Sequence, residues 1–282
     1  MLAAALALAS ALSYGLSDYA GGVLSKSRSV WSVAAASQLT AALATALVEI
    51  LAPGNPSAAD FAWGAAAGLG GALGIVFLYR GLSRGRMSVV APVSGVGAAL
   101  IPVVVGIAGG EQPPTLVWAG IALALPAIYL IPQVSPEQEG SAGGPPQPSA
   151  AGDGVLAGIG FGVLFALIGQ MGEDSGFLPL SVTQLVNGAA VALAAVALRQ
   201  QWLPRGPGKL PVYALGLLAM AGSVLFLLAT RQGLLTVVSV IASLYPASTV
   251  ALAAVFLGER LGRLQIVGLA IAAAAVTLVS IG

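Results

Sequence analysis

The sequence contains no cysteine and no histidine, and charged residues occupy only 7% of its 282 positions. The first absence excludes disulfides, thiol chemistry, histidine metal sites and histidine proton relays. The second excludes an ordinary soluble fold, because soluble domains carry about 25% charged residues. With 58% hydrophobic residues, the chain cannot cover its surface with water-compatible groups. We therefore expect an integral membrane protein with the lipid bilayer as its main partner.

Other absences narrow the function. A net charge of +1 gives no support for a nucleic-acid partner. No nucleophile with a base, no paired carboxylates and no set of metal ligands occurs in the apolar runs, so we expect no enzyme activity, cofactor or metal site. No ring of like charges or filter-like segment indicates a channel. The first apolar run lacks a basic start, and we interpret it as a membrane span rather than a signal peptide.

Clusters of glycine, proline and charge divide the chain into ten long apolar runs. Each is close to the roughly 20 residues that a spanning helix needs. None shows the two-residue alternation of a barrel strand, so the fold class predicted is all-α with ten transmembrane helices. The predicted spans are 2–24, 31–51, 62–82, 87–109, 115–132, 154–172, 180–199, 211–229, 235–257 and 263–281.

The ten spans divide into two similar halves. The longest polar stretch, "QVSPEQEGSAGGPPQPSAAGDG", separates them, and its composition is typical of a flexible connector. At an offset of 148 residues, "MSVV" aligns with "LTVV", "GGE" with "LGE" and "WAGIAL" with "IVGLAI". We predict a first repeat at 1–132, a linker at 133–153 and a second repeat at 154–282. Because five spans is an odd number, the second repeat is inverted, which predicts a midplane site between the halves and alternating access.

The end of each half carries a recognisable pattern. Pro246 followed by "FLGERLGRLQIVGLAIAAAAV" resembles the signature of the EamA-type, ten-span branch of the drug/metabolite transporter superfamily, and "GGE" with "WAGIALAL" resembles its first-half copy. The resemblance implies a small-molecule substrate, and an exporter or exchanger of small metabolites, often amino acids, in a bacterial inner membrane. The first-half Pro92 does not align with Pro246, which departs from a strict repeat.

Prolines and glycines indicate how the helices bend and pack. Pro246 removes a backbone donor and predicts a kink in the ninth span; Pro92 and Pro102 can bend the fourth. We interpret these three prolines as hinges of cavity-lining helices. Pairs such as Gly70 and Gly74 have the small-xxx-small spacing that lets helix backbones approach closely.

Polar and aromatic residues within the spans are the candidate substrate ligands. Gln38 and Gln184 occupy corresponding places in the two halves, and Asn187 lies one turn beyond Gln184 on the same face. An amide can bind ammonium and carboxylate groups alike, although each amide can instead serve as an interhelical hydrogen bond. Aromatic residues can supply an apolar wall or a cation–π contact. The predicted substrate-binding residues are Tyr14, Gln38, Phe77, Tyr79, Phe161, Gln184, Asn187, Ser243 and Tyr245.

Asp18 is the one acidic residue for which we consider a coupling role. It lies late in the first span, where an interfacial position is the simpler interpretation. On that interpretation no carboxylate is buried, which favours uniport or exchange of a neutral or zwitterionic solute. The alternative is a proton-coupled multidrug or metabolite antiporter in which Asp18 holds proton and substrate in turn.

Two indications of membrane orientation disagree. Loops with odd numbers carry ten of the eleven basic residues, and loops with even numbers carry only Arg231. The positive-inside rule then places the odd loops in the cytoplasm and both termini outside. The family resemblance implies the reverse. The sequence does not determine the oligomeric state.

Overall fold

The computed structural model describes residues 1–84, 87–130, 148–205, 209–257 and 261–281, and this part of the chain is built from α-helices. The helices are α1 (Leu2–Ser27), α2 (Val30–Leu51), α3 (Ala58–Arg84), α4 (Met87–Ala108), α5 (Thr115–Leu130), α7 (Pro148–Ile168), α8 (Leu178–Ala197), α9 (Leu210–Thr230), α10 (Leu235–Ala242), α11 (Tyr245–Phe256) and α12 (Arg263–Ile281).

Every predicted span coincides with a helix, so the all-α membrane class is confirmed. By length and composition, five of the described helices are long and apolar enough to cross a membrane. Shorter apolar stretches occupy α4, α5, α7 and α12. The predicted linker 133–153 lies mostly outside the described residues, although α7 already begins within it at Pro148. The five membrane-length helices are Val30–Leu51, Ala58–Arg84, Leu178–Ala197, Leu210–Thr230 and the broken ninth span Leu235–Phe256.

The ninth span is broken where its proline predicted a kink. α10 ends at Ala242 and α11 begins at Tyr245, with Pro246 in its first turn. Proline suits this position because its missing N–H would have no helical partner there. By contrast, α4 runs as one helix through Pro92 and Pro102. A hinge role for the three prolines therefore stays a prediction, with a visible break only at Pro246.

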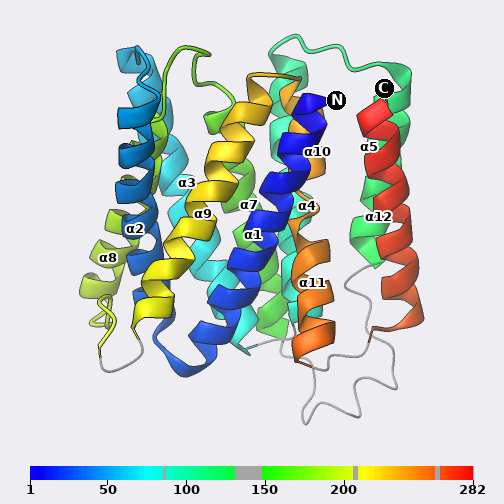
Figure 1. The fold of residues 1–282 in the computed structure, drawn as a ribbon. Helices are drawn as coiled ribbons and strands as arrows, with labels where there is room; N and C mark the ends of the chain where they lie inside the picture. Colours follow the sequence, from blue (N-terminus) through cyan, green and yellow to red (C-terminus); the bar gives the residue numbers. More distant parts are fainter. Residues whose placement is uncertain (85–86, 131–147, 206–208, 258–260, 282) are drawn as a thin grey trace.

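The two halves of the chain interleave. α7 packs against α3 and α4, while α1 packs correspondingly against α9 and α11. The contact of α3 with α8 likewise corresponds to the contact of α2 with α9. Corresponding helices of the two halves also contact each other: α2 with α8, α4 with α10 and α5 with α12. Such reciprocal contacts are expected if an approximate two-fold axis relates the halves, but the inverted repeat itself stays a prediction. Both termini lie at the same end of the bundle, here named the terminal end (Figure 1).

Glycines make the central contacts of α7 possible. A Cβ atom at Gly160 would lie 2.7 Å from the carbonyl oxygen of Gly70 and closer still to the backbone nitrogen of Gly74. On the other side of α7, a Cβ at Gly158 would lie 2.8 Å from the carbonyl oxygen of Ser94 in α4. The close packing predicted from small-xxx-small spacing is therefore present, and it inserts the second half into the first.

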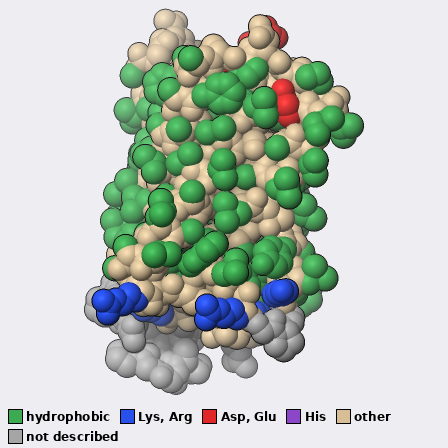
Figure 2. All heavy atoms as spheres, turned by 90° about the vertical axis from the view of Figure 1, so that its left-hand side faces the viewer, with side chains coloured by type: hydrophobic (Ala, Val, Ile, Leu, Met, Phe, Trp, Pro, Cys, Tyr) green, Lys and Arg blue, Asp and Glu red, His purple; other side chains and the backbone are tan. Residues whose placement is uncertain are grey.

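Charge separates the two ends of the bundle. The end of the bundle opposite the termini is here named the basic end. It contains the ends of α1, α3 and α8 and the starts of α9 and α12. Its basic residues are Lys26, Arg84, Arg199, Arg205, Lys209 and Arg263. Figure 2 shows basic side chains in a row beneath a broad band of hydrophobic ones, with acidic side chains at the other end. A hydrophobic band of this kind is the surface that lipid covers in a membrane protein, and the basic row marks one of its boundaries.

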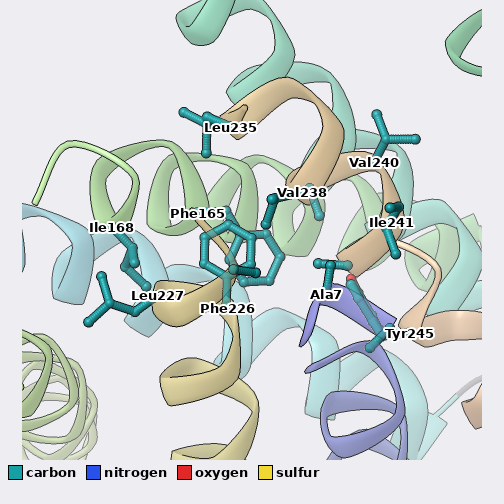
Figure 3. Packing of buried hydrophobic residues seen from close by; sticks show 14 of the residues in the cluster. Ala7, Phe165, Ile168, Phe226, Leu227, Leu235, Val238, Val240, Ile241 and Tyr245 are labelled. Atoms are coloured by element: carbon teal, nitrogen blue, oxygen red, sulfur yellow. The ribbon is translucent and has the colours of Figure 1, made fainter. Parts of the chain in front are cut away.

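Two apolar clusters fill the interior at different depths. One occupies the terminal side and includes Phe165, Phe226, Leu227 and Ala7 (Figure 3), with the two phenyl rings stacked at 4.5 Å between centroids. The second occupies the basic side and includes Leu78 of α3 together with residues of α2, α4 and α9. The depth between these clusters is the middle of the membrane-spanning bundle.

Replacing Gly160 by alanine tests the α7 contact. The added methyl group collides with backbone, which cannot move aside as a side chain can, and overpacking of this kind costs about 1–3 kcal/mol. We expect the melting temperature in detergent to fall by roughly 3–10 °C. Gly152→Ala in the same helix is the control, because its Cβ would meet nothing within 4 Å. Equal melting temperatures for the two variants would contradict the packing described here.

Candidate functional site

A small cavity lies at mid-depth between the two apolar clusters. Helices α1, α2 and α3 of the first half and α7, α8 and α9 of the second contribute its walls. Its volume is about 40 Å³, room for about one water molecule, whereas sites for small molecules usually enclose about 300–1,000 Å³. Six of the nine predicted substrate-binding residues line it: Tyr14, Gln38, Tyr79, Phe161, Gln184 and Asn187.

Gln184 and Asn187 offer hydrogen-bonding groups that the protein leaves unused. Both side chains come from one face of α8, and each is less than 5% exposed. The hydroxyl of Thr45 donates to Gln184 Oε1 at 2.6 Å, which holds that side chain in place. Gln184 Nε2 and Asn187 Oδ1 have no partner among the described residues. A buried polar atom without a partner costs about 1–3 kcal/mol, so these atoms indicate where a ligand would bind.

Asp18 does not lie at a membrane boundary, and the interfacial interpretation of this residue was wrong. Its side chain is only 7% exposed and forms part of the cavity wall, one helical turn beyond Tyr14. No lysine or arginine pairs with it in the described ranges, where the only ion pair joins Arg80 to Asp153. A carboxylate at this depth is therefore present, and it faces the same space as the free amide groups.

Two tyrosines line the cavity, Tyr14 beside the terminal-side cluster and Tyr79 within the basic-side cluster. Tyr14 shares a hydroxyl–hydroxyl hydrogen bond of 2.9 Å with Ser223 of α9, and its ring lies 5.5 Å from that of Phe165. Tyr79 of α3 is 1% exposed, and its ring closes against the backbone of Gly21. These hydroxyls and rings give the cavity both polar and aromatic surface.

Three predicted ligands lie away from the cavity wall. Phe77 stacks instead beneath the guanidinium of Arg80, 4.5 Å from ring centroid to Cζ. Tyr245 hydrogen-bonds the hydroxyl of Ser94 at 2.6 Å, and Ser243 lies between α10 and α11. Both belong to the broken ninth span, where Tyr245 fills the contact between α11 and α4 rather than open space. A substrate-binding role for these three stays a prediction without support from the cavity.

The cavity also contains hydroxyls that the sequence did not single out. Ser17 comes directly before Asp18 in the chain, and Thr183 comes directly before Gln184. Ser223 stands alone among apolar residues in its span. Adjacency to Asp18 and Gln184 was a usable signal for the first two. Nothing in the sequence distinguished Ser223 from other serines of the spans, because its place depends on how α9 packs against α1.

Comparison with known proteins indicates the functional class and the fold. Residues 152–281 match the EamA-like transporter family. This half of the chain is an EamA-like transporter domain. No curated protein matches the chain. A solved structure described as "Crystal structure of protein" has the same fold, with a TM-score of 0.70 and 14% identity over 99% of this chain and 96% of that one.

The EamA-like match confirms several expectations drawn from the sequence. The chain is a multi-pass membrane protein, and residues 152–281 match a family that comprises small-molecule transporters rather than enzymes. The solved structure shares the fold across both halves. The cavity, which lies between the EamA-like domain and the first half, is the candidate transport site.

Carboxylates of the first half clasp the EamA-like domain at the terminal end. Glu49 accepts hydrogen bonds from the backbone N–H groups of Phe177 and Leu178 at the start of α8. Glu111 accepts from Leu235 at 2.7 Å and Thr236 at 2.9 Å, at the start of α10. Each carboxylate satisfies amides that a helix leaves unpaired and faces the positive end of its dipole.

Two further polar contacts join the halves. Asp60 of α3 accepts a hydrogen bond of 2.7 Å from the backbone of Gly172, also at the terminal end. At the basic end Arg80 of α3 forms a bidentate ion pair with the buried carboxylate of Asp153 in α7. Arg80 of the first half therefore binds the EamA-like domain directly.

Glu111→Gln tests the clasp on α10. The amide keeps one acceptor but places an NH₂ group against a backbone N–H, which removes a charged hydrogen bond worth about 1.5–3 kcal/mol. We expect the melting temperature in detergent to fall by roughly 3–10 °C. The matched control is Glu173→Gln, an exposed carboxylate at the same end of the bundle. A variant as stable as the control would show that Glu111 does not hold α10.

Proposed function

We propose that the protein exports or exchanges small zwitterionic metabolites, amino acids first among them, by alternating access through the central cavity. The observation that carries this proposal is the composition of the cavity wall. A carboxylate, an unused amide donor and an unused amide acceptor lie together at mid-depth. A solute with one ammonium and one carboxylate group complements all three.

The chemistry of the wall supports two recognition subsites. Asp18 and the Oδ1 atom of Asn187 can accept hydrogen bonds from an ammonium group. Gln184 Nε2 and the amide of Gln38 can donate to a carboxylate. An amide offers both a donor and an acceptor whichever way it is turned, so this complementarity does not depend on the orientation of either side chain. Tyr14 and Tyr79 provide the surface for the remainder of the solute.

The size of the cavity supports alternating access. About 40 Å³ cannot hold an amino acid, so the walls must separate before one binds. Apolar clusters lie on both sides of the cavity. Separation of the halves on one side at a time would open a path to the site without opening a continuous pore. Export across a bacterial inner membrane is the direction and location that the family resemblance suggests.

Transport in proteoliposomes tests the proposal. Saturable flux of at least one labelled amino acid is expected, and Gln184→Leu or Asn187→Leu should reduce kcat/KM about tenfold, because each removes a hydrogen bond to a charged group. Gln170→Leu is the matched control, since Gln170 is an exposed residue just beyond the end of α7. Flux no greater than in empty vesicles across a broad panel of metabolites would contradict the proposal.

The position of Asp18 favours a second candidate, proton-coupled antiport. A buried carboxylate without a described cationic partner can bind a proton and an ammonium group alternately. Coupling of this kind would drive export with the proton gradient.

Asp18→Asn distinguishes coupling from simple exchange. Asparagine keeps the size of the side chain but cannot exchange a proton at physiological pH. If Asp18 is the coupling residue, an imposed pH gradient should no longer drive uptake in the variant, while exchange of labelled for unlabelled substrate persists. Gradient-driven uptake equal to that of the unmodified protein would exclude Asp18 as the coupling residue.

A further inference from the structure

The loop between α8 and α9 forms a hollow that the transport site does not use. It encloses about 440 Å³ at the basic end of the bundle, and its walls come from residues 196–205. Two arginines, Arg199 and Arg205, line it together with Trp202. The central cavity is built from other residues at mid-depth, so the two are separate.

Hydrogen bonds fix the loop that carries these arginines. The hydroxyl of Ser29, at the start of α2, donates to the carbonyl oxygen of Gln201 at 2.9 Å. The Gln201 side chain donates in turn to the carbonyl oxygen of Leu203 at 2.9 Å. Arg199 has a φ of 54°, a left-handed conformation that non-glycine residues seldom adopt. The backbone that carries Arg199 is therefore held in one conformation by the folded loop.

Neither arginine has a carboxylate partner among the described residues. The one described carboxylate near the basic end, Asp153, is already paired with Arg80. Lys209, at the start of α9, adds a third positive charge at the same end of the bundle. An anion is the ligand that this arrangement would attract.

The hollow borders the part of the surface that faces lipid. Leu193, Val196 and Leu198, at the end of α8, are each more than half exposed, and Leu210 begins α9 with 75% exposure. Figure 2 shows hydrophobic side chains directly above the basic row on the side that carries α2 and α8. Trp202 lies at this boundary, where tryptophan is enriched in membrane proteins. A water-soluble anion would gain nothing from such an apolar border.

We infer that the hollow is a binding site for an anionic phospholipid. Arg199 and Arg205 bind its phosphate, which guanidinium groups recognise with paired hydrogen bonds. One acyl chain extends along the exposed leucine and valine side chains of α8. Basic pockets at membrane boundaries bind anionic head groups in this way. The site would tie the α8–α9 loop, and with it one end of two cavity-lining helices, to the surrounding lipid.

Native mass spectrometry of the purified protein, titrated with phosphatidylglycerol or phosphatidylcholine in detergent, tests the site. We expect phosphatidylglycerol to bind more tightly, and Arg199→Gln with Arg205→Gln to weaken its binding about thirtyfold, or about fivefold for each charge. Arg263→Gln, at the same end of the bundle on α12, is the control and should leave the affinity unchanged. Circular dichroism establishes that each variant remains helical.

Three results would overturn the inference. Equal affinities for the two lipids would show that the charges do not select the head group. Unchanged phosphatidylglycerol binding in the double variant would place the lipid elsewhere. Displacement of the lipid by millimolar inorganic phosphate would identify a site for the free anion, because phosphate makes no use of the apolar border.

Discussion

The close approach of α7 to α3 and α4 is the contact on which the rest of the structure depends. Gly158 and Gly160 allow that approach because their backbones touch those of the neighbouring helices. Through it, the first helix of the second half enters the first half of the chain. The cavity lies between the halves only because they interleave in this way, and its walls are drawn equally from both. In a lipid environment such contacts provide van der Waals packing that the hydrophobic effect does not supply.

Hydrogen bonds within single helices explain why few buried polar groups mark the site. Within the described residues, several buried hydroxyls donate to a carbonyl one turn earlier in their own helix, as Thr183 does to Pro179 and Ser239 to Leu235. Such groups are satisfied without a ligand. The unused atoms of Gln184 and Asn187 differ because they face a cavity that also contains a carboxylate. In the proposed function, a bound solute of matching polarity supplies the missing hydrogen bonds.

The sequence predicted the positions of the helices along the chain well, but it predicted poorly how deep single residues lie in the bundle. Apolar runs located all ten spans, Pro246 located the break in the ninth, and the three-residue spacing of Gln184 and Asn187 placed both on one wall. Asp18 was misplaced because α1 extends to Ser27, so a residue late in the apolar run lies at mid-depth in the bundle. The clasps formed by Glu49 and Glu111 join residues more than 120 positions apart. No local pattern reveals such contacts, since they depend on which helix starts lie at the same end.

The two ends of the transporter are closed by contacts of different strength. At the terminal end Glu49, Asp60 and Glu111 accept five hydrogen bonds from backbone N–H groups of the other half. Charged hydrogen bonds of this kind are worth about 1.5–3 kcal/mol each. At the basic end the described polar contacts between the halves include the Arg80–Asp153 pair and the Ser29–Gln201 hydrogen bond. Arg80 is 39% exposed, and ion pairs open to solvent contribute about 0–1 kcal/mol. The described contacts therefore hold the terminal end through charged hydrogen bonds to backbone N–H groups, whereas the Arg80–Asp153 pair at the basic end is partly open to solvent.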